Sequence, residues 1–215
     1  MTSVADRYFP SLSPQQSEKF ALLKDFYSEW NAKINVISRK DITNFDINHL
    51  LHSLAIAKFT SFAGGTKIID IGTGGGLPGI PLAIMFPDVN FTLIDSIAKK
   101  IKVASAISEG LGLKNVSCIA ARSEEMRGSF DFVICRAVTR MDRFISMTDH
   151  LLSATSFNVL PNGYIVLKGG ELDEELTSFS RTVTVKNISE WFTEPFFETK
   201  KIIFIPYRLQ KKITI

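Results

Sequence analysis

A glycine-rich segment, DIGTGGGLPGI from residue 70, lies between two apolar runs and allows two interpretations. The spacing G-x-G-x-x-G at Gly74, Gly76 and Gly79 is typical of a loop that binds the pyrophosphate of a dinucleotide. In such a loop, however, the first glycine directly follows a strand. Here that residue is Gly72, and the spacing counted from it is G-x-G-x-G. This second spacing indicates a different ligand.

Two carboxylates accompany the loop and favour the second interpretation. Asp95 ends the next predicted strand, 23 residues after Gly72, where it can accept hydrogen bonds from a ribose diol. Asp70 directly precedes the loop, and we expect its carboxylate to face the same site. Two carboxylates would repel a pyrophosphate but tolerate a cationic ligand. S-adenosylmethionine carries a ribose, an amino-acid tail and a sulfonium but no phosphate, so these residues favour it over NAD.

These residues need a scaffold, and the central part of the chain predicts one. Short apolar runs alternate with helical stretches, which indicates a parallel sheet covered by helices on both faces. The predicted strands are residues 67–71, 90–95, 116–120, 130–135 and 163–168. The predicted helices are residues 78–86, 97–111, 122–127 and 141–155, and one from about 171. We expect ligands beyond the carboxyl ends of the strands, where the loop lies.

The two ends of the chain differ from this pattern. Two helices are predicted before the sheet, over residues 14–30 and 46–60, and Ser13 and Pro14 open the first. Residues 181–189 and 200–207 have no predicted helix between them and indicate an antiparallel pair. The expected fold is α/β, a doubly wound sheet with a C-terminal hairpin. We expect an N-terminal helical cap (1–62) and a core (63–215) within one structural unit.

Composition narrows the class of protein. Of the 215 residues, 45% are hydrophobic and 22% are charged, as in an ordinary folded domain. Cys118 and Cys135 lie in predicted strands, which excludes a disulfide framework or a zinc site. His49 and His52 have no third ligand nearby in sequence, so we expect no metal. No signal pattern or membrane-spanning run is seen, and we expect a cytoplasmic protein.

The charge distribution suits a polyanionic partner. The net charge is only +3, but the basic residues are clustered. The clusters comprise Lys99, Lys100 and Lys102; Arg136, Arg140 and Arg143; and Lys200, Lys201, Arg208, Lys211 and Lys212. Nucleic acid and an ordinary solvated surface are equally compatible with such clusters.

The glycine-rich segment and several others resemble one family. DIGTGGGLPGIPLAI, residues 70–84, is similar to D-[IV]-G-T-G-x-G-L-P-G-I-P-L-[AS]-[IV], and its LPGIP part is the most specific. Other similar segments are FTLIDSIAKK (91–100), ARSEE (121–125), CRAV (135–138) and VLKGG (166–170), with WNAKINVIS and HLLHS upstream. Over nearly its whole length the chain resembles the ribosomal small subunit methyltransferase G family, also called glucose-inhibited division protein B.

This resemblance implies a class I, Rossmann-like methyltransferase that transfers a methyl group from S-adenosylmethionine to guanine N7 in 16S rRNA. Its partner would be 16S rRNA or the 30S subunit, and we expect a monomer. The family implies that Gly72 and Leu77 line the cofactor and that Ser123, Glu124 and Arg136 contact it. It also places Arg122 and Lys168 on the RNA side. The full cofactor-binding set is Asp70, Gly72, Gly74, Gly76, Leu77, Asp95, Ser123, Glu124 and Arg136. The candidate catalytic residues are Arg136, Arg122 and Lys168.

The chain departs from the family pattern at a few positions. Gly75 replaces a usual proline, which we expect to loosen the loop, and Cys135 replaces a serine. Asn48 and His52 stand where the family has arginine and aspartate, which predicts a compensated pair or an altered rRNA contact.

Guanine N7 has a free lone pair, so an in-line displacement needs no general base, and the protein must act by positioning. We hypothesise that Arg136 or Arg122 donates to guanine O6 or to a phosphate. Two alternatives remain open at this point: an NAD-dependent oxidoreductase, and a catalytically silent nucleotide- or RNA-binding module.

Overall fold

The computed structural model describes residues 3–38, 41–136, 140–176 and 183–207, apart from the side chains of residues 173 and 174. Its centre is a seven-stranded sheet in the order β3-β2-β1-β4-β5-β7-β6. The strands are β1 (Lys67–Ile71), β2 (Asn90–Asp95), β3 (Val116–Ala120), β4 (Phe132–Arg136), β5 (Gly163–Gly169), β6 (Thr184–Asn187) and β7 (Lys200–Pro206). Strands β1 to β5 are parallel, and β7 is antiparallel to both β5 and β6. The predicted doubly wound α/β sheet with a C-terminal hairpin is confirmed.

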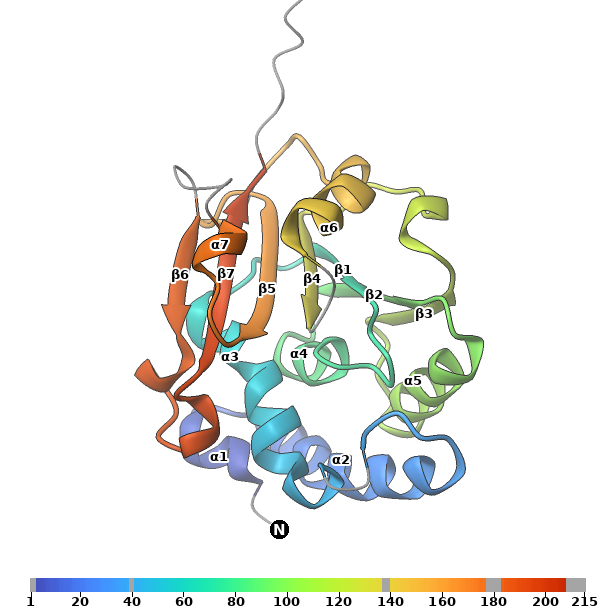
Figure 1. Ribbon diagram of the computed structural model, residues 1–215. Helices are drawn as coiled ribbons and strands as arrows, with labels where there is room; N and C mark the ends of the chain where they lie inside the picture. Colours follow the sequence, from blue (N-terminus) through green and yellow to red (C-terminus); the bar gives the residue numbers. More distant parts are fainter. Residues whose placement is uncertain (1–2, 39–40, 137–139, 177–182, 208–215) are drawn as a thin grey trace, which may run out of the picture.

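Helices cover both faces of this sheet (Figure 1). They are α1 (Val4–Tyr8), α2 (Pro14–Lys33), α3 (His52–Phe59), α4 (Gly79–Met85), α5 (Ala98–Gly110), α6 (Met141–Thr148) and α7 (Asp173–Leu176). Helices α1 to α5 contribute buried or partly buried residues to one hydrophobic core, and α6 and α7 to another. Alternation along the strands produces this division, since Ile68 belongs to the first core and Ile69 to the second.

The N-terminal helices share the first core with the sheet. Ser13 and Gln16 form a capping box at the start of α2, and Pro14 is the first helical residue, as predicted. Tyr27, fully buried on this helix, donates a hydrogen bond of 2.9 Å to the carbonyl of Gly75 in the glycine loop. The division into a cap (1–62) and a core stays a prediction, but α2 directly supports the loop.

The predicted helix over residues 46–60 has two parts. Asp46–Leu51 forms a π-helix, and α3 continues from His52. π-Helical turns are rare in proteins. Those that occur are often found near functional sites, because they change the direction in which side chains project. Here it carries Asn48 and His49 toward the end of β4, as the site geometry below shows.

Several predicted boundaries need correction. The helix expected at 122–127 is a single 3₁₀ turn, Ser123–Glu125. The helix expected at 141–155 ends at Thr148 and is followed by a 3₁₀ turn, Asp149–Leu151. The connection between β6 and β7 also contains two 3₁₀ turns, Ile188–Glu190 and Pro195–Phe197, where no helix was predicted. Hydrophobic periodicity predicts such short turns as longer helices or misses them, because they have too few residues to form an apolar stripe.

Gly75 has a tighter role than the predicted loosening of the loop. A Cβ built on this buried residue would lie 2.9 Å from Val36 Cγ2 and 3.4 Å from Tyr27 Cε1. We therefore expect Gly75→Ala to lower the free energy of unfolding by about 1–3 kcal/mol, because the N-terminal segment must shift. Urea denaturation measures this loss. Gly64→Ala is the control, since its Cβ would meet only Asp88 Cβ at 3.6 Å, and equal stability of the two variants would contradict the argument.

Candidate functional site

Three glycines shape the loop between β1 and α4. Gly72, Gly74 and Gly76 have φ angles of 67°, 59° and 103°, which L side chains rarely adopt. Gly79 differs, because it begins α4 and packs against β2. A Cβ on Gly79 would lie 2.1 Å from Leu93 Cδ2. The loop therefore follows the G-x-G-x-G spacing, and Gly79 is a packing residue.

Several backbone amides of this loop are already occupied. Gly74 N donates to Asp95 Oδ2 at 3.1 Å, and Gly79 N donates to Asp70 Oδ2 at 2.9 Å. Leu77 N donates to the carbonyl of Thr73 at 2.9 Å. A dinucleotide loop must offer such amides to a pyrophosphate. The occupied amides fit a ligand without phosphate, as the residues suggested for S-adenosylmethionine.

Asp70 stabilises the glycine loop from the protein interior and is not exposed to a ligand. Its side chain is fully buried, and Oδ2 accepts hydrogen bonds from Thr73 Oγ1 at 2.6 Å and from Gly79 N. The prediction that its carboxylate faces the ligand is therefore corrected. The side chains of a strand alternate between its two faces, and at position 70 the side chain points into the protein interior. Gly76 and Leu77 are also buried, inside the turn.

Burial gives Asp70 an unusual titration. Desolvation raises its pKa to about 7, although the hydrogen bonds from Thr73 and Gly79 act in the opposite direction. The folded protein thus retains a proton that the unfolded chain releases above pH 4. Between about pH 4 and 7, this group makes the folded state less stable as the pH rises.

We expect Asp70→Asn to remove this contribution. The free energy of unfolding of the variant should exceed that of the wild type at pH 8 by roughly 1 kcal/mol or more, and the gap should be clearly smaller at pH 5 and close only below about pH 4. Denaturant titrations at both pH values measure the difference. His49 and His52 titrate equally in both proteins, so they cancel. A pH-independent gap would contradict the assignment.

A cleft of about 470 Å³ lies beyond the ends of β1, β2 and β3. Asp95 lines it at the end of β2 and is only 8% exposed. Its Oδ1 accepts a hydrogen bond from Ile97 N at 2.9 Å, and its Oδ2 accepts the bond from Gly74 N. Two backbone donors thus orient the carboxylate, and each oxygen keeps a lone pair for a diol. Gly72 lies beside it in the same cleft.

The opposite wall of the cleft follows β3 and includes α6. Ser123 and Glu124 line the cleft from the 3₁₀ turn, and the Ser123 hydroxyl donates to Glu124 Oε2 at 2.9 Å. Hydrogen bonds from its own backbone and from Ser123 lower the pKa of Glu124. Arg122 lines this same cleft, together with Arg143 of α6. Arg122, predicted to face RNA, thus lies among the residues predicted to bind the cofactor.

A second cavity of about 370 Å³ lies beyond the ends of β4 and β5. It contains Arg136 and Lys168, the other two candidate catalytic residues, together with His52 and Lys200. Lys168 forms an ion pair with Glu175 of α7, and Glu175 also accepts a hydrogen bond of 2.6 Å from Met141 N at the start of α6. Lys168 is therefore held at the cavity wall.

Arg136 in this cavity has only uncharged hydrogen-bond partners. Its Nη1 donates to His49 Nδ1 at 3.1 Å and, more weakly, to Asn48 O at 3.4 Å. No ion pair between described residues involves Arg136. Desolvation lowers its pKa and also lowers that of His49, to about 4, so His49 is neutral and can accept the bond. A partly buried guanidinium with neutral partners is prepared for an electron-rich ligand.

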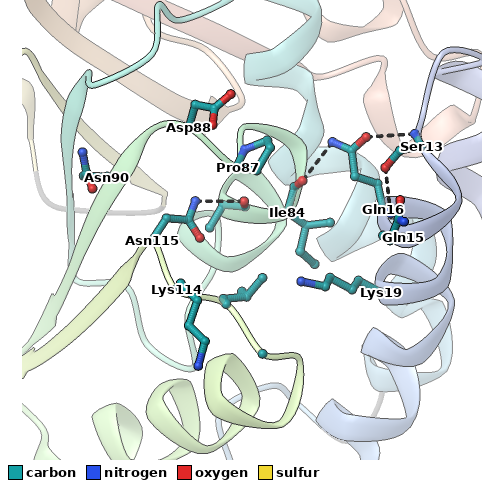
Figure 2. A pocket seen from close by; sticks show the side chains of 13 residues that line it. Ser13, Gln15, Gln16, Lys19, Ile84, Pro87, Asp88, Asn90, Lys114 and Asn115 are labelled. Carbon is teal, nitrogen blue, oxygen red and sulfur yellow. Dashed lines mark hydrogen bonds between the residues drawn. The ribbon is translucent and has the colours of Figure 1, made fainter.

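Another hollow, of about 680 Å³, lies beyond the amino ends of β2 and β3. In Figure 2 two of its polar side chains, Gln16 and Asn115, are bonded to the protein. Gln16 donates to the carbonyls of Ile84 and Met85, and Asn115 donates to Ala83 O. These bonds cap the end of α4, so the hollow is explained by structure.

The sequence itself decides the family. The sequence model of the GidB family, rRNA small subunit methyltransferase G, matches residues 16–203. The chain is 51% identical to ribosomal RNA small subunit methyltransferase G of Bacteroides thetaiotaomicron over 198 residues, which cover 92% of this chain and 96% of that protein. The chain belongs to the rRNA small subunit methyltransferase G family. The methyltransferase G of Flavobacterium psychrophilum is 50% identical, with 95% and 97% of the chains covered.

Solved structures support the fold of this methyltransferase G family member. A SAM-dependent methyltransferase from Aquifex aeolicus aligns with a TM-score of 0.58 and 13% identity, covering 80% of this chain and 100% of that one. A SAM-dependent O-methyltransferase from Thermotoga maritima also aligns with a TM-score of 0.58, at 15% identity, covering 80% and 72%. The predicted family and the class I methyltransferase fold are confirmed, and the dinucleotide interpretation of the loop is wrong.

The described residues form neither a membrane-spanning helix nor a metal-binding cluster. No helix there is long and apolar enough to span a membrane. No group of three or more His, Cys, Asp or Glu residues there is arranged to hold a metal ion. Of the predicted basic residues, Arg208, Lys211 and Lys212 lie outside the described part of the chain.

Sequence reasoning missed the role of two residues near Arg136. His49 and Asn48 contact its guanidinium across 87 and 88 positions of sequence. The H-x-x-H spacing drew attention to His49 and His52 as a rejected metal site, and the departure from the family pattern at Asn48 and His52, which predicted a compensated pair or an altered rRNA contact, was the available signal.

Proposed function

We propose that this protein transfers a methyl group from S-adenosylmethionine to N7 of a guanine in 16S rRNA. The observation that carries the proposal is the arrangement at the carboxyl edge of the sheet. A cleft around Asp95 and a cation-lined cavity around Arg136 lie at the ends of neighbouring parallel strands. Membership of the methyltransferase G family supplies the acceptor class.

The residues of the cleft fit the cofactor. Asp95 would hold the ribose diol. Gly72 lies beside it and, having no Cβ, would let the ligand approach the backbone of the loop. Ser123 and Glu124 would contact the opposite side of the ligand, and Arg143 offers a cation for its carboxylate. When bound, S-adenosylmethionine supplies an electrophilic methyl group on a sulfonium. The same arrangement gives no role to Asp70 except as the support of the loop.

The second cavity, around Arg136, contributes to the reaction by positioning the acceptor guanine. Guanine N7 has a free lone pair, so none of these residues has to remove a proton. Arg136 donates to the base, and Lys168 and Lys200 supply positive charge at the rim. His49 keeps the guanidinium in place through its neutral Nδ1. These residues lower the barrier by holding and orienting the acceptor.

The cationic residues around both cavities suit an RNA backbone. Lys100 and Arg122 line the cofactor cleft, and Lys200 lines the second cavity. They supply the phosphate contacts that a single flipped nucleotide and its neighbours require. We propose 16S rRNA, free or within the 30S subunit, as the partner, with the protein acting as a cytoplasmic monomer.

Mapping of N7-methylguanosine tests the proposal. Small-subunit rRNA from cells lacking the protein should lack one N7-methylguanosine, and the purified protein with S-adenosylmethionine should restore it. Calorimetric titration with S-adenosylmethionine and with NAD identifies the ligand of the cleft. Binding of S-adenosylmethionine without any turnover would leave a silent binding module, and binding of NAD would overturn the proposal.

A further inference from the structure

The carboxylate of Glu175 joins three elements at the carboxyl edge of the sheet. Glu175 belongs to α7, and its Oε1 accepts a hydrogen bond from Lys168 Nζ near the end of β5. The same oxygen accepts a hydrogen bond of 2.6 Å from the backbone amide of Met141, the first residue of α6. One side chain of a four-residue helix thus fastens the start of α6 to the sheet.

The ion pair of Lys168 and Glu175 is enclosed. Their side chains are 12% and 19% exposed, whereas every other ion pair between described residues has a side chain that is at least 42% exposed. Lys168 follows Val166 by two positions, so it projects from the face of the sheet that carries the second core, α6 and α7. Removal of one partner from an enclosed pair leaves the other charge uncompensated, so this pair is a specific bridge.

Helix α6 lies between this bridge and the cofactor cleft. It packs against α7 and against the 3₁₀ turn Ser123–Glu125, and its Arg143 and Met147 line the cleft. The first amides of a helix have no partner within the helix, and a carboxylate there is favoured by the helix dipole. Glu175 supplies that carboxylate two residues before Arg143, so it fixes the backbone from which Arg143 projects.

Arg143 is free to bind an anionic ligand. Its side chain forms no ion pair with another described residue. A guanidinium binds a carboxylate most strongly when its planar fork faces both oxygens, so the interaction depends on where the helix holds it.

We propose that Glu175 positions Arg143 for the carboxylate of S-adenosylmethionine, by fastening the start of α6 to Lys168. The proposal rests on the proposed function, in which Arg143 offers a cation for that carboxylate. It adds a positioning residue that acts on the cofactor through α6.

Two ligands test the proposal by calorimetric titration: S-adenosylmethionine and its decarboxylated analogue, which keeps the adenosine, the sulfonium and the amino group. The wild type should bind S-adenosylmethionine at least about tenfold more tightly than the analogue. Glu175→Ala should weaken binding of S-adenosylmethionine by about tenfold and leave the affinity for the analogue unchanged. Arg143→Ala should show the same selective loss, and the double variant should lose no more than Arg143→Ala alone.

Two further variants control for loss of the ion pair itself. Glu190→Ala is matched, because Glu190 also pairs with a lysine, Lys186, at 3.7 Å and accepts a hydrogen bond from a backbone amide, Asn187 N, at 3.3 Å. Glu190 lines neither cavity, so this variant should bind both ligands as the wild type does. Glu175→Gln retains an oxygen for Met141 N and should lose only about threefold, again for S-adenosylmethionine alone.

Equal weakening of both ligands by Glu175→Ala, or no weakening of either, would overturn the proposal and make Glu175 structural. If Glu175→Ala does not fold, the same comparison with Glu175→Gln decides. Equal affinity of the wild type for the two ligands, or a full additional loss in the double variant, would also overturn it. No binding of S-adenosylmethionine by the wild type would instead refute the proposed function.

Discussion

Arg136→Ala is expected to lower kcat/KM for rRNA methylation by at least about 100-fold, the effect of removing a charged donor from an enclosed site. The reason is the state of its guanidinium, which is enclosed beside neutral partners, His49 Nδ1 and Asn48 O. Arg136→Lys should fail nearly as severely, since an ammonium keeps the charge but lacks the planar fork. Methyl incorporation into small-subunit rRNA measures both effects.

The same substitution should barely change the stability of the fold. Removing a desolvated charge offsets the loss of its two hydrogen bonds, so the melting temperature should stay within about 4 °C of the wild type. Arg7→Ala is the matched control: Arg7 is exposed, pairs with Glu194 at 3.8 Å and lines neither cavity, so the variant should remain active. Full activity of Arg136→Ala would remove Arg136 from the catalytic residues.

The sheet was predictable because its signals are local. The apolar run at residues 67–71 coincides with β1, and Asp95 ends β2 as expected. The G-x-G-x-G spacing was predictable for a similar reason, because positive φ angles restrict residue type at each position. In both cases neighbouring residues alone determine the structure.

The less predictable features depend on contacts between distant parts of the chain. The π-helix at Asp46–Leu51 has the same apolar pattern as an α-helix, and its hydrogen bonding cannot be read from that pattern. Asp70 was expected to face the ligand because it directly precedes the loop. Its carboxylate instead points inward and accepts a hydrogen bond from the amide of Gly79, which packs against β2. The need for glycine at position 75 likewise follows from its contact with Val36.

Asp95→Ala should weaken binding of S-adenosylmethionine by about 100-fold or more. Hydrogen bonds to a charged group contribute about 1.5–3 kcal/mol each, and the carboxylate is placed to accept two from a ribose diol. It is unusually well oriented for this, because Gly74 N and Ile97 N each bond to one of its oxygens. Calorimetric titration of the purified protein with S-adenosylmethionine measures the loss without requiring turnover.

Two further variants distinguish the loss of hydrogen bonds to the ribose diol from the general effect of substituting a buried carboxylate. Asp95→Asn keeps one acceptor oxygen and should lose about tenfold, an intermediate value. Asp131→Asn is the matched control, since Asp131 is 6% exposed and accepts a hydrogen bond from Lys67 N at 2.8 Å at the opposite end of β1. Its affinity should equal that of the wild type. If Asp95→Ala and Asp131→Asn lost the same affinity, the effect would be one of stability, and Asp95 would no longer be assigned to the ribose.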